Sequence, residues 1–289
     1  MKKTFVCVFR RGVQCEYELD KDVELTNVID DCGPIIYQAQ WLRRRRDNEG
    51  AIVLIERDEQ PSEYEQKVYS TFIKHQHIIH TYGFVENDRG SVIILQEQAP
   101  YGNLLSLLQS GQFQPTAAVL VEIFSQVIKA LVEIIHQGLV HGDLRCENIY
   151  VFQMHPTDPK KNSVKLANFI STHPNDASYT DDRRVHIPVR YCALEILRSA
   201  GHSNYSELSD VYSMGVLMWQ AFSQGKLPYE SSTTNSEVRQ RKLKDEKLSR
   251  PLSCHQLVWP IIVDCWYNAP EVRFNFKDMQ TRFRNLGRQ

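Results

Sequence analysis

The eight residues HGDLRCEN at positions 141–148 decide which fold this 289-residue chain adopts. The residues that follow, Ile-Tyr-Val at 149–151, are β-branched and aromatic and predict a strand. Asp143 and Asn148 therefore place a carboxylate and an amide in one short loop, five positions apart. A carboxylate can accept the proton of an attacking hydroxyl, and an amide oxygen can ligate Mg²⁺. Taken alone, the pair also fits a capped polar turn, so its meaning depends on the sequence around it.

The composition of the chain excludes several classes of protein. Apolar residues make up 42%, and 34 Lys and Arg nearly balance 35 Asp and Glu, which is too apolar and too neutral for a disordered chain. The same balance gives no basic field of the kind that drives nucleic-acid binding. No apolar run approaches the roughly 18 residues of a membrane span. We therefore expect neither nucleic-acid binding nor a membrane span.

Two features predict a cytoplasmic protein. The apolar stretch at residues 4–9 imitates a signal peptide, but it is short and ends at Arg10 and Arg11, so we do not expect secretion. The seven cysteines include no CxxC pair, and an odd, scattered set is typical of reduced thiols in the cytosol.

The first part of the chain predicts a β-rich unit. Apolar residues alternate over 5–19, with a break at Arg11-Gly12, and predict a hairpin or a pair of edge strands within an extension at 1–21. One helix is predicted within 62–74, where Ser62 and Glu65 have the spacing of a capping box. Further strands are predicted at 23–29, 35–42, 51–55, 82–86 and 92–96.

After Pro100 the pattern becomes helical. Apolar residues recur with helical spacing over 116–137 and Gly138 follows as a C-cap, so this segment predicts a long amphipathic helix. The chain thus predicts an α+β protein in which a small β-rich lobe (about 22–98) precedes a larger, mainly helical lobe (about 99–289), and the motifs described next imply that the two lobes form one domain at 22–289. Other helices are predicted at 210–222, 258–267 and 276–286.

The octapeptide resembles the catalytic loop of protein kinases, H-R-D-L-x-x-x-N. The resemblance implies a bilobal protein-kinase fold, with Asp143 as catalytic base and Asn148 as a Mg²⁺ ligand. Other segments resemble kinase motifs in the family's order: the start of the lower lobe at 100–104, an A-P-E-like triplet at 193–195, the start of a buried helix at 209–216 and C-W-x-x-x-P-E-x-R at 265–273. Residues implied to belong to structural motifs are His141, Phe169, Glu195, Asp210 and Arg273.

Within the family, the sequence is similar to tyrosine kinases. Arg145 stands two residues after Asp143, and the IPVRY sequence at 187–191 resembles the tyrosine-kinase substrate platform. Tyr179, nine residues before Pro188, matches the activation-loop tyrosine and is the implied regulatory phosphosite.

Some features resemble the pseudokinase domain of Janus kinases. These are Gln96, the His-Gly pair at 141–142, the segment 75–79 and the long connection 153–163. The pattern of that domain has H-G-N where this chain has His-Gly-Asp, so the finer match is incomplete.

The metal site departs from the family pattern. The Asp-Phe-Gly that holds Mg²⁺ is here Asn168-Phe169-Ile170, so an uncharged amide replaces a carboxylate. Mg²⁺ is usually held through carboxylates and substrate phosphates. Asn148 and Asn168 remain as weak Mg²⁺ candidates, and we expect Mg²⁺ binding to be weak or absent.

The loop that covers the phosphates also departs from its pattern, G-x-G-x-x-G. Ile29, Asp31 and Pro34 take the three glycine positions, and only a displaced Gly33 remains. Asp31 would bring negative charge to the phosphates, and Pro34 has no N–H to donate to them.

No lysine stands in the strand that carries the ATP-binding lysine of the family. Leu54 takes its position, and Arg57 is a substitute only in a shifted register. The helix glutamate that pairs with this lysine maps to Glu65 or Gln66, and we expect the ion pair to be absent. Gly142 replaces the arginine that receives the activation-loop phosphate in the family.

The sequence contains residues that favour ATP binding and residues that oppose it. Gln96 takes the gatekeeper position, and the backbone groups of Glu97 and Ala99 are placed to pair with adenine. Against this, Tyr150 replaces the usual leucine beneath the adenine and Ile52 would crowd it from above, so the residues weigh slightly against ATP. The candidate nucleotide contacts are Gly33, Ile36, Ile52, Leu54, Gln96, Glu97, Ala99, Tyr150 and Asn168.

We therefore expect a tyrosine-kinase-like pseudokinase, a regulatory or scaffolding module that binds a protein partner such as an active kinase or a signalling adaptor. One alternative is an atypical, weakly active ATP-dependent protein tyrosine kinase with Arg57 in place of the lysine. The other is a nucleotide-binding switch without phosphotransfer.

Overall fold

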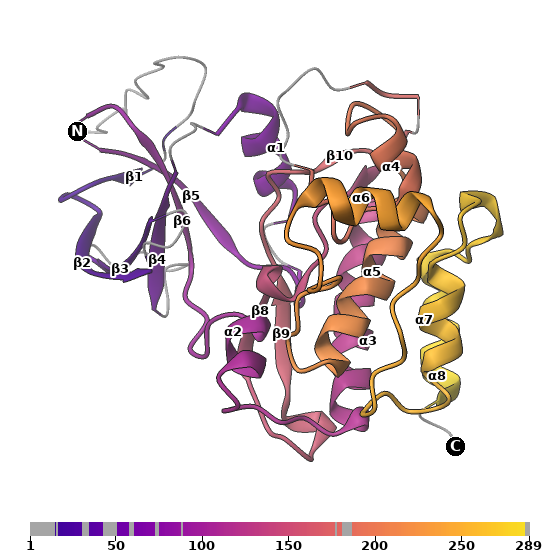
Figure 1. Cartoon of the computed structure of the whole chain (residues 1–289). Helices are drawn as coiled ribbons and strands as arrows, with labels where there is room; N and C mark the ends of the chain where they lie inside the picture. The colour runs from indigo at the N-terminus through magenta and orange to yellow at the C-terminus, as the bar shows by residue number, and fades with distance from the viewer. Residues whose placement is uncertain are drawn as a thin grey trace. The chain divides into compact units, whose positions relative to one another are not determined.

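The computed structural model describes residue 15 and residues 17–30, 35–42, 51–57, 61–72, 75–87, 89–176, 178–180 and 187–286. The chain divides into two compact units, residues 1–98 and 99–289. The smaller unit is mainly β-sheet and the larger is mainly helical, which confirms the predicted α+β fold class (Figure 1).

The smaller unit is built on a six-stranded sheet in the order β1-β5-β6-β4-β3-β2. Neighbouring strands are antiparallel except for β1, which lies parallel to β5 at one edge. All five strands predicted between 23 and 96 are present, with ends within about one residue of the prediction. The strands are β1 (Tyr17–Glu18), β2 (Val23–Asp30), β3 (Ile35–Trp41), β4 (Ile52–Glu56), β5 (Thr81–Glu86) and β6 (Val92–Glu97).

One face of this sheet carries a compact apolar core. Inward side chains alternate with outward ones along each strand, so residues two apart, such as Ile52 and Leu54, enter the same core. Tyr17 of β1 packs on it and lies 5.5 Å from the Trp41 ring. β1 is therefore an edge strand, and residues 1–14 and 16 of the predicted hairpin lie outside the described part of the chain. The buried core residues are Val23, Ala39, Ile52, Leu54, Val85, Ile93 and Leu95.

The predicted helix of the smaller unit is α1 (Glu63–Thr71). Ser62 is its N-cap, and the Ser62 hydroxyl accepts the N–H of Glu65 at 3.1 Å. Only this half of the predicted capping box forms, because the Glu65 carboxylate is paired with Arg57 instead.

The larger unit is a set of helices with two short antiparallel strand pairs, β8–β9 and β7–β10 (Figure 1). The helices predicted at 116–137, 210–222, 258–267 and 276–286 are all present. The helices are α2 (Leu104–Gln109), α3 (Ala117–His136), α4 (Leu194–Arg198), α5 (Glu207–Phe222), α6 (Asn235–Leu243), α7 (Trp259–Cys265) and α8 (Phe276–Leu286), and the strands are β7 (Leu139–Val140), β8 (Ile149–Gln153), β9 (Ser163–Leu166) and β10 (His173–Pro174).

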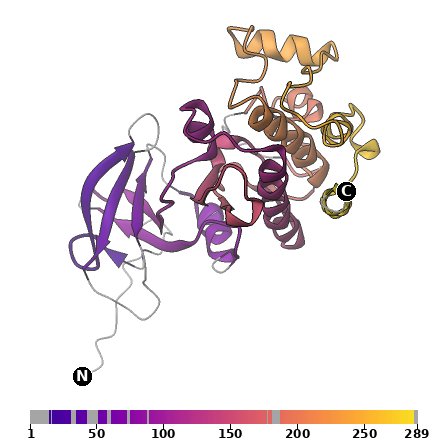
Figure 2. The same ribbon diagram turned by 90° about the horizontal axis from the view of Figure 1, so that it is seen from below.

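Helix α5 is the centre of the larger unit, since every residue from Ser209 to Phe222 is buried. A helix that is buried all round belongs to a core. Phe124 of α3 contacts Phe222 and Phe283, with ring centroids 5.7 and 6.3 Å away, so α3, α5 and α8 share one core. Figure 2 shows α3 and α5 side by side. No helix in the described ranges is long and apolar enough to cross a membrane.

A buried ion pair joins two of the motif residues. The Arg273 guanidinium lies 2.6 Å from the Glu195 carboxylate, and its side chain is fully buried. Arg273 also donates to the carbonyls of Tyr267 and Leu208, at 2.8 Å each. Because a buried charge is tolerated only when it is paired and hydrogen-bonded, this cluster fixes the segments that carry it relative to one another within the unit.

Candidate functional site

The loop at 141–148 lies between β7 and β8 and is anchored by a buried carboxylate. Asp210 of α5 accepts the backbone N–H of His141 at 2.6 Å and that of Gly142 at 3.0 Å. Burial raises the pKa of the Asp210 carboxyl to about 7, although the two N–H donors act in the opposite direction. The anchor ties the candidate catalytic loop to the central helix.

His141 and Phe169 are packing residues of the larger unit. Their rings are buried and make an edge-to-face contact at 5.5 Å. The His141 Nε2 contacts the carbonyl of Ala167 at 3.0 Å, and burial lowers the pKa of the imidazole. The His141 ring is therefore positioned to hold the loop rather than to exchange protons.

Asp143, Asn148 and Asn168 form one chain of hydrogen bonds. The Asn148 amide nitrogen donates to the backbone carbonyl of Asp143 at 2.7 Å and to the Asp143 carboxylate at 3.0 Å. Since this nitrogen must face two acceptors, the Asn148 amide oxygen faces the other way. There it accepts the Asn168 amide nitrogen at 3.1 Å. The structure thus brings together all three residues that the sequence assigned to catalysis or metal binding.

The second oxygen of the Asp143 carboxylate lies 3.2 Å from the Nε of Arg145. The Arg145 guanidinium also pairs with Glu147 at 2.8 Å. A carboxylate offers about four lone-pair positions, so Asp143 retains room to accept the proton of a hydroxyl. The loop therefore keeps a proton acceptor in a fixed position.

The donor atoms at this site do not suit Mg²⁺. Asn148 and Asn168 are neutral amides, and the Asn148 oxygen is already the acceptor for Asn168. Asn168 has a φ of 68°, a left-handed conformation that asparagine tolerates, and this conformation brings the two amides together. Over the described ranges, no group of three or more His, Cys, Asp or Glu residues is placed to hold a metal ion. Mg²⁺ favours carboxylates and phosphates, so the protein alone does not fit it.

In the smaller unit, several candidate nucleotide contacts have structural roles. Ile52 and Leu54 are fully buried in the sheet core, and Ile36 is half-buried in β3. The amide of Gln96, the predicted gatekeeper, is buried and donates to the Thr81 hydroxyl at 2.9 Å. Gly33 lies outside the described residues.

Of the two residues whose backbone was predicted to face adenine, each has one backbone group with a partner inside the chain. The Glu97 N–H donates to the carbonyl of His80 at 3.0 Å. The Ala99 carbonyl accepts the N–H of Gly102 at 3.2 Å. Tyr150 is half-buried at the start of β8, where it forms an isolated bridge with Asn103.

The expectation that the strand–helix ion pair is absent is wrong. Arg57, which follows β4, lies 2.8 Å from the Glu65 carboxylate of α1, and the side chains are only 10% and 8% exposed. In the register expected from the sequence, Leu54 takes the position of the family's lysine, and the longer arginine three positions later reaches the helix instead. The observed pair is a substitute for the one that the family pattern places between the lysine position and the helix.

The predicted substrate platform at 187–191 is fastened by cations that donate to carbonyls. Arg190 donates to the carbonyls of Pro228, Tyr229 and Ser232 at 2.7–3.0 Å. The other side is held by Lys242 of α6, whose burial has no signal in the sequence because lysine side chains usually lie in solvent.

Lys242 is only 1% exposed, and its ammonium donates to the carbonyls of Val189 at 2.9 Å and Cys192 at 2.5 Å. The ammonium also lies 5.1 Å from the centre of the Tyr212 ring. Burial lowers the pKa of Lys242 to about 8.

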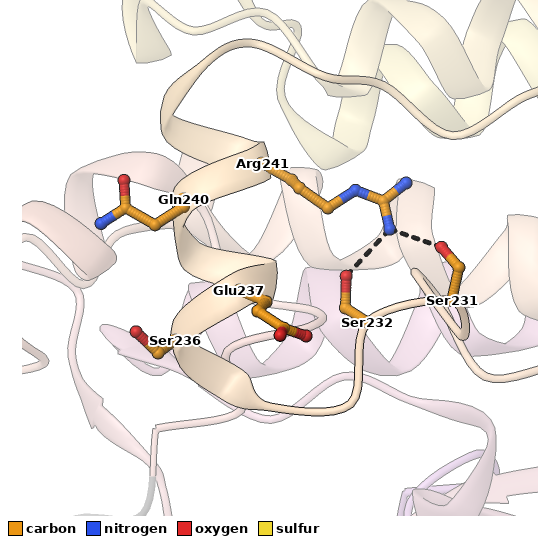
Figure 3. Close-up of a pocket in the computed structure, with 6 residues that line it drawn as sticks. All are labelled: Ser231, Ser232, Ser236, Glu237, Gln240 and Arg241. Atoms are coloured by element: carbon orange, nitrogen blue, oxygen red, sulfur yellow. Dashed lines mark hydrogen bonds between the residues drawn. The ribbon is translucent and has the colours of Figure 1, made fainter.

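A pocket of about 470 Å³ lies beside α6 (Figure 3). The Arg241 guanidinium in its wall donates to the hydroxyls of Ser231 and Ser232 and pairs with Glu246. Because this cation is already paired with Glu246, the lining residues offer no unpaired positive charge for an anionic nucleotide. The lining residues are Ser231, Ser232, Ser236, Glu237, Gln240 and Arg241.

A model of the protein tyrosine and serine/threonine kinase family matches residues 36–283. The chain is 29% identical to tyrosine-protein kinase Fer of Rattus norvegicus, over 71% of this chain and 24% of the relative. It is 31% identical to protein-tyrosine kinase 6 of Mus musculus, over 74% of this chain and 46% of the relative. With tyrosine-protein kinase Btk of Drosophila melanogaster it shares 28% identity, over 74% of this chain and 26% of the relative. The chain thus spans less than half of each of these relatives.

Proposed function

This chain belongs to the protein tyrosine and serine/threonine kinase family, and we propose that within it the chain is a tyrosine-kinase-like pseudokinase. Its role would be to bind a protein partner in cytoplasmic signalling, such as an active kinase or an adaptor, without appreciable phosphotransfer. The observation that carries this proposal is the hydrogen-bonded chain of Asp143, Asn148 and Asn168, in which amide contacts stand where the family has a metal carboxylate.

Phosphoryl transfer depends on positioning and charge neutralisation more than on covalent chemistry by the protein. Removing one contact that stabilises transition-state charge costs about 3 kcal/mol in comparable enzymes. This chain has an amide for the metal carboxylate at Asn168 and a leucine for the lysine at Leu54. Even if the two losses are not additive, they would lower the rate by several orders of magnitude.

The structural contacts support an intact binding module. The Arg57–Glu65 and Glu195–Arg273 pairs and the Asp210 anchor each join separate segments of a unit. Each of them is made by groups of the chain itself, as a folded partner-binding surface requires.

A weakly active tyrosine kinase is the second candidate. Asp143 keeps room to accept a proton, and the Arg57–Glu65 pair restores a cation to the strand–helix contact. In this alternative, Arg57 would take the part of the missing lysine and ATP would bring the negative charge that Mg²⁺ needs.

The test combines nucleotide binding with phosphate transfer. The melting temperature of the chain is measured with ATP, with and without Mg²⁺, and transfer to a tyrosine peptide is measured with the wild type and with Asp143→Asn. We expect no transfer and little change in melting temperature, because only a ligand that binds the native state raises it. Transfer that is lost in Asp143→Asn would overturn the pseudokinase proposal in favour of the second candidate. A rise in melting temperature without transfer would indicate a nucleotide-binding switch.

A further inference from the structure

The pocket beside α6 shares a wall with the segment that fastens the predicted substrate platform. Ser232, which lines the pocket, is only 5% exposed, and its carbonyl accepts the Arg190 guanidinium at 3.0 Å. The Ser232 N–H donates to the carbonyl of Tyr229 at 2.9 Å, and the same carbonyl accepts Arg190 at 2.9 Å. The pocket and the platform are therefore fixed to one segment, and a partner that covers the platform also meets the pocket.

The Arg241 guanidinium is fully engaged in the wall of this pocket. Its Nε donates to one oxygen of the Glu246 carboxylate at 2.8 Å, and its Nη2 pairs with the other oxygen. Its Nη1 donates to the hydroxyls of Ser231 at 2.7 Å and Ser232 at 2.9 Å (Figure 3). Each guanidinium nitrogen thus has a partner in the chain, and Glu246 balances the positive charge.

The Glu237 carboxylate supplies the charge that remains. Its Oε2 accepts the N–H and the hydroxyl of Thr233, at 2.8 and 3.2 Å, and the N–H of Thr234 at 3.3 Å. The Thr233 and Thr234 N–H groups lower the pKa of Glu237, so the carboxylate is ionised at neutral pH. Within the described residues, its Oε1 accepts no hydrogen bond and the carboxylate makes no ion pair.

The start of α6 holds this carboxylate in a fixed position. The Thr234 hydroxyl accepts the N–H of Glu237 at 3.2 Å, and the carboxylate accepts the Thr234 N–H in return, which completes a capping box. Figure 3 shows Glu237 and Arg241 on the side of α6 that faces Ser231 and Ser232. An anion that is already held in place loses little conformational freedom when a cation binds it.

We propose that this pocket receives a basic side chain, arginine or lysine, of the partner protein, with the Glu237 carboxylate as its counter-ion. The cation would contact Oε1 of Glu237. The hydroxyl oxygens of Ser231 and Ser232 each accept one N–H of Arg241, and each keeps a second lone pair for the incoming cation. The inference rests on the proposed role of the chain as a binding module and adds the chemistry that its partner presents.

The probe for the test is N-acetyl-arginine methylamide, and its matched neutral control is N-acetyl-citrulline methylamide. Each is titrated at constant ionic strength into the full chain labelled with ¹⁵N, and the backbone amide shifts are followed by NMR. We expect saturable shifts at residues 231–241 with a dissociation constant of about 1–20 mM for the arginine probe, because a single exposed ion pair is weak. The citrulline probe, which lacks the charge, should bind at least about fivefold more weakly.

Two variants test the counter-ion. Glu237→Gln removes the charge but keeps an oxygen for the capping box, and it should weaken binding of the arginine probe at least about threefold. Gln240→Lys leaves the cap unchanged and supplies an internal cation three positions from Glu237, so it should weaken binding by a similar factor. Glu271→Gln is the matched control: the residue is exposed and does not line the pocket, and binding should stay within about 1.5-fold of the wild type.

Three results would overturn the proposal. They are equal binding of the two probes, shifts at other acidic segments in place of residues 231–241, and arginine binding that is the same in the wild type, Glu237→Gln and Gln240→Lys. Phosphotransfer by the chain would instead overturn the pseudokinase assignment. It would leave the probe titration as it stands, because the pocket contains none of the residues proposed for catalysis.

Discussion

The Arg57 guanidinium lies 2.8 Å from the Glu65 carboxylate, and about nine-tenths of each side chain is buried. The pair connects the segment after β4 to α1 without the lysine that its family uses for that contact. The smaller unit thus keeps the attachment of its helix to its sheet, while the position of the missing lysine, Leu54, has become part of the apolar core.

Arg57→Met should destabilise the chain by about 3 kcal/mol, because it leaves the Glu65 carboxylate buried without its cation. Urea unfolding would measure the loss. Lys67→Met, at an exposed position of the same helix, is the matched control and should change the free energy of unfolding by less than about 0.5 kcal/mol. Equal effects of the two substitutions would show that the ion pair does not hold α1.

Asn168→Asp should make the stability of the chain depend on Mg²⁺. A carboxylate at this position cannot donate to the Asn148 oxygen, so without metal the variant should lose about 1–2 kcal/mol. Together with Asp143, the new carboxylate supplies the negative charge that Mg²⁺ favours, and metal binding to the native state would then raise the melting temperature.

The measurement is the melting temperature of wild type and Asn168→Asp with and without millimolar MgCl₂. The wild type should show no specific rise. If the wild type is stabilised by Mg²⁺ as much as the variant, the amide chain is not what excludes the metal.

Because of Lys242, the free energy of unfolding should rise with pH between about 8 and 10.5. Burial lowers its pKa to about 8 in the folded chain, against 10.5 in the unfolded chain, so in this window the unfolded state binds more protons. Stability therefore increases as the pH rises, by at most about 3 kcal/mol for this group.

The difference in unfolding free energy between wild type and Lys242→Met isolates this contribution, since the other titrating groups are common to both. The difference should move in favour of the wild type between pH 8 and pH 10. A difference that is constant over that range would mean that the ammonium is not buried as described.

Gly142→Ala should cost about 2 kcal/mol more than Gly138→Ala. Both glycines have a positive φ, 79° and 71°, so both substitutions impose similar backbone strain. A Cβ at Gly142 meets the Ser171 carbonyl, whereas a Cβ at Gly138 has nothing within 4 Å. Thermal or urea unfolding of the two variants gives the difference, and equal costs would argue against the close contact of the loop with Ser171.

Much of the fold could be predicted from the sequence because periodicity reports burial. The helical spacing at 116–137 and 276–286 and the alternating strands between 23 and 96 all led to elements at those places. Asp143, Asn148 and Asn168 could be found because each lies in a short kinase-like motif. The hydrogen bonds between these three residues could not be predicted, because the spacing does not say which atom of an amide faces which neighbour.

The contacts that were missed join residues far apart in the chain. Arg57 reaches Glu65 because its side chain is long and points toward α1. Assigning the lysine position to Leu54 gives no information about where the Arg57 side chain points. His173 and Tyr205 carry no sequence signal for stacking. Lys242 looks like a solvated residue of a polar helix, and only the carbonyls of Val189 and Cys192 explain its burial.

The carbonyl cage around Lys242 also has a practical consequence for chemical footprinting. Amine-reactive reagents need an accessible, unprotonated nitrogen, and here the nitrogen is enclosed and holds two hydrogen bonds. In the native chain this amine would be labelled far more slowly than the exposed Lys244 two positions later on the same polypeptide. The ratio of the two labels therefore reports, in a single mass spectrum, what fraction of the larger unit has opened.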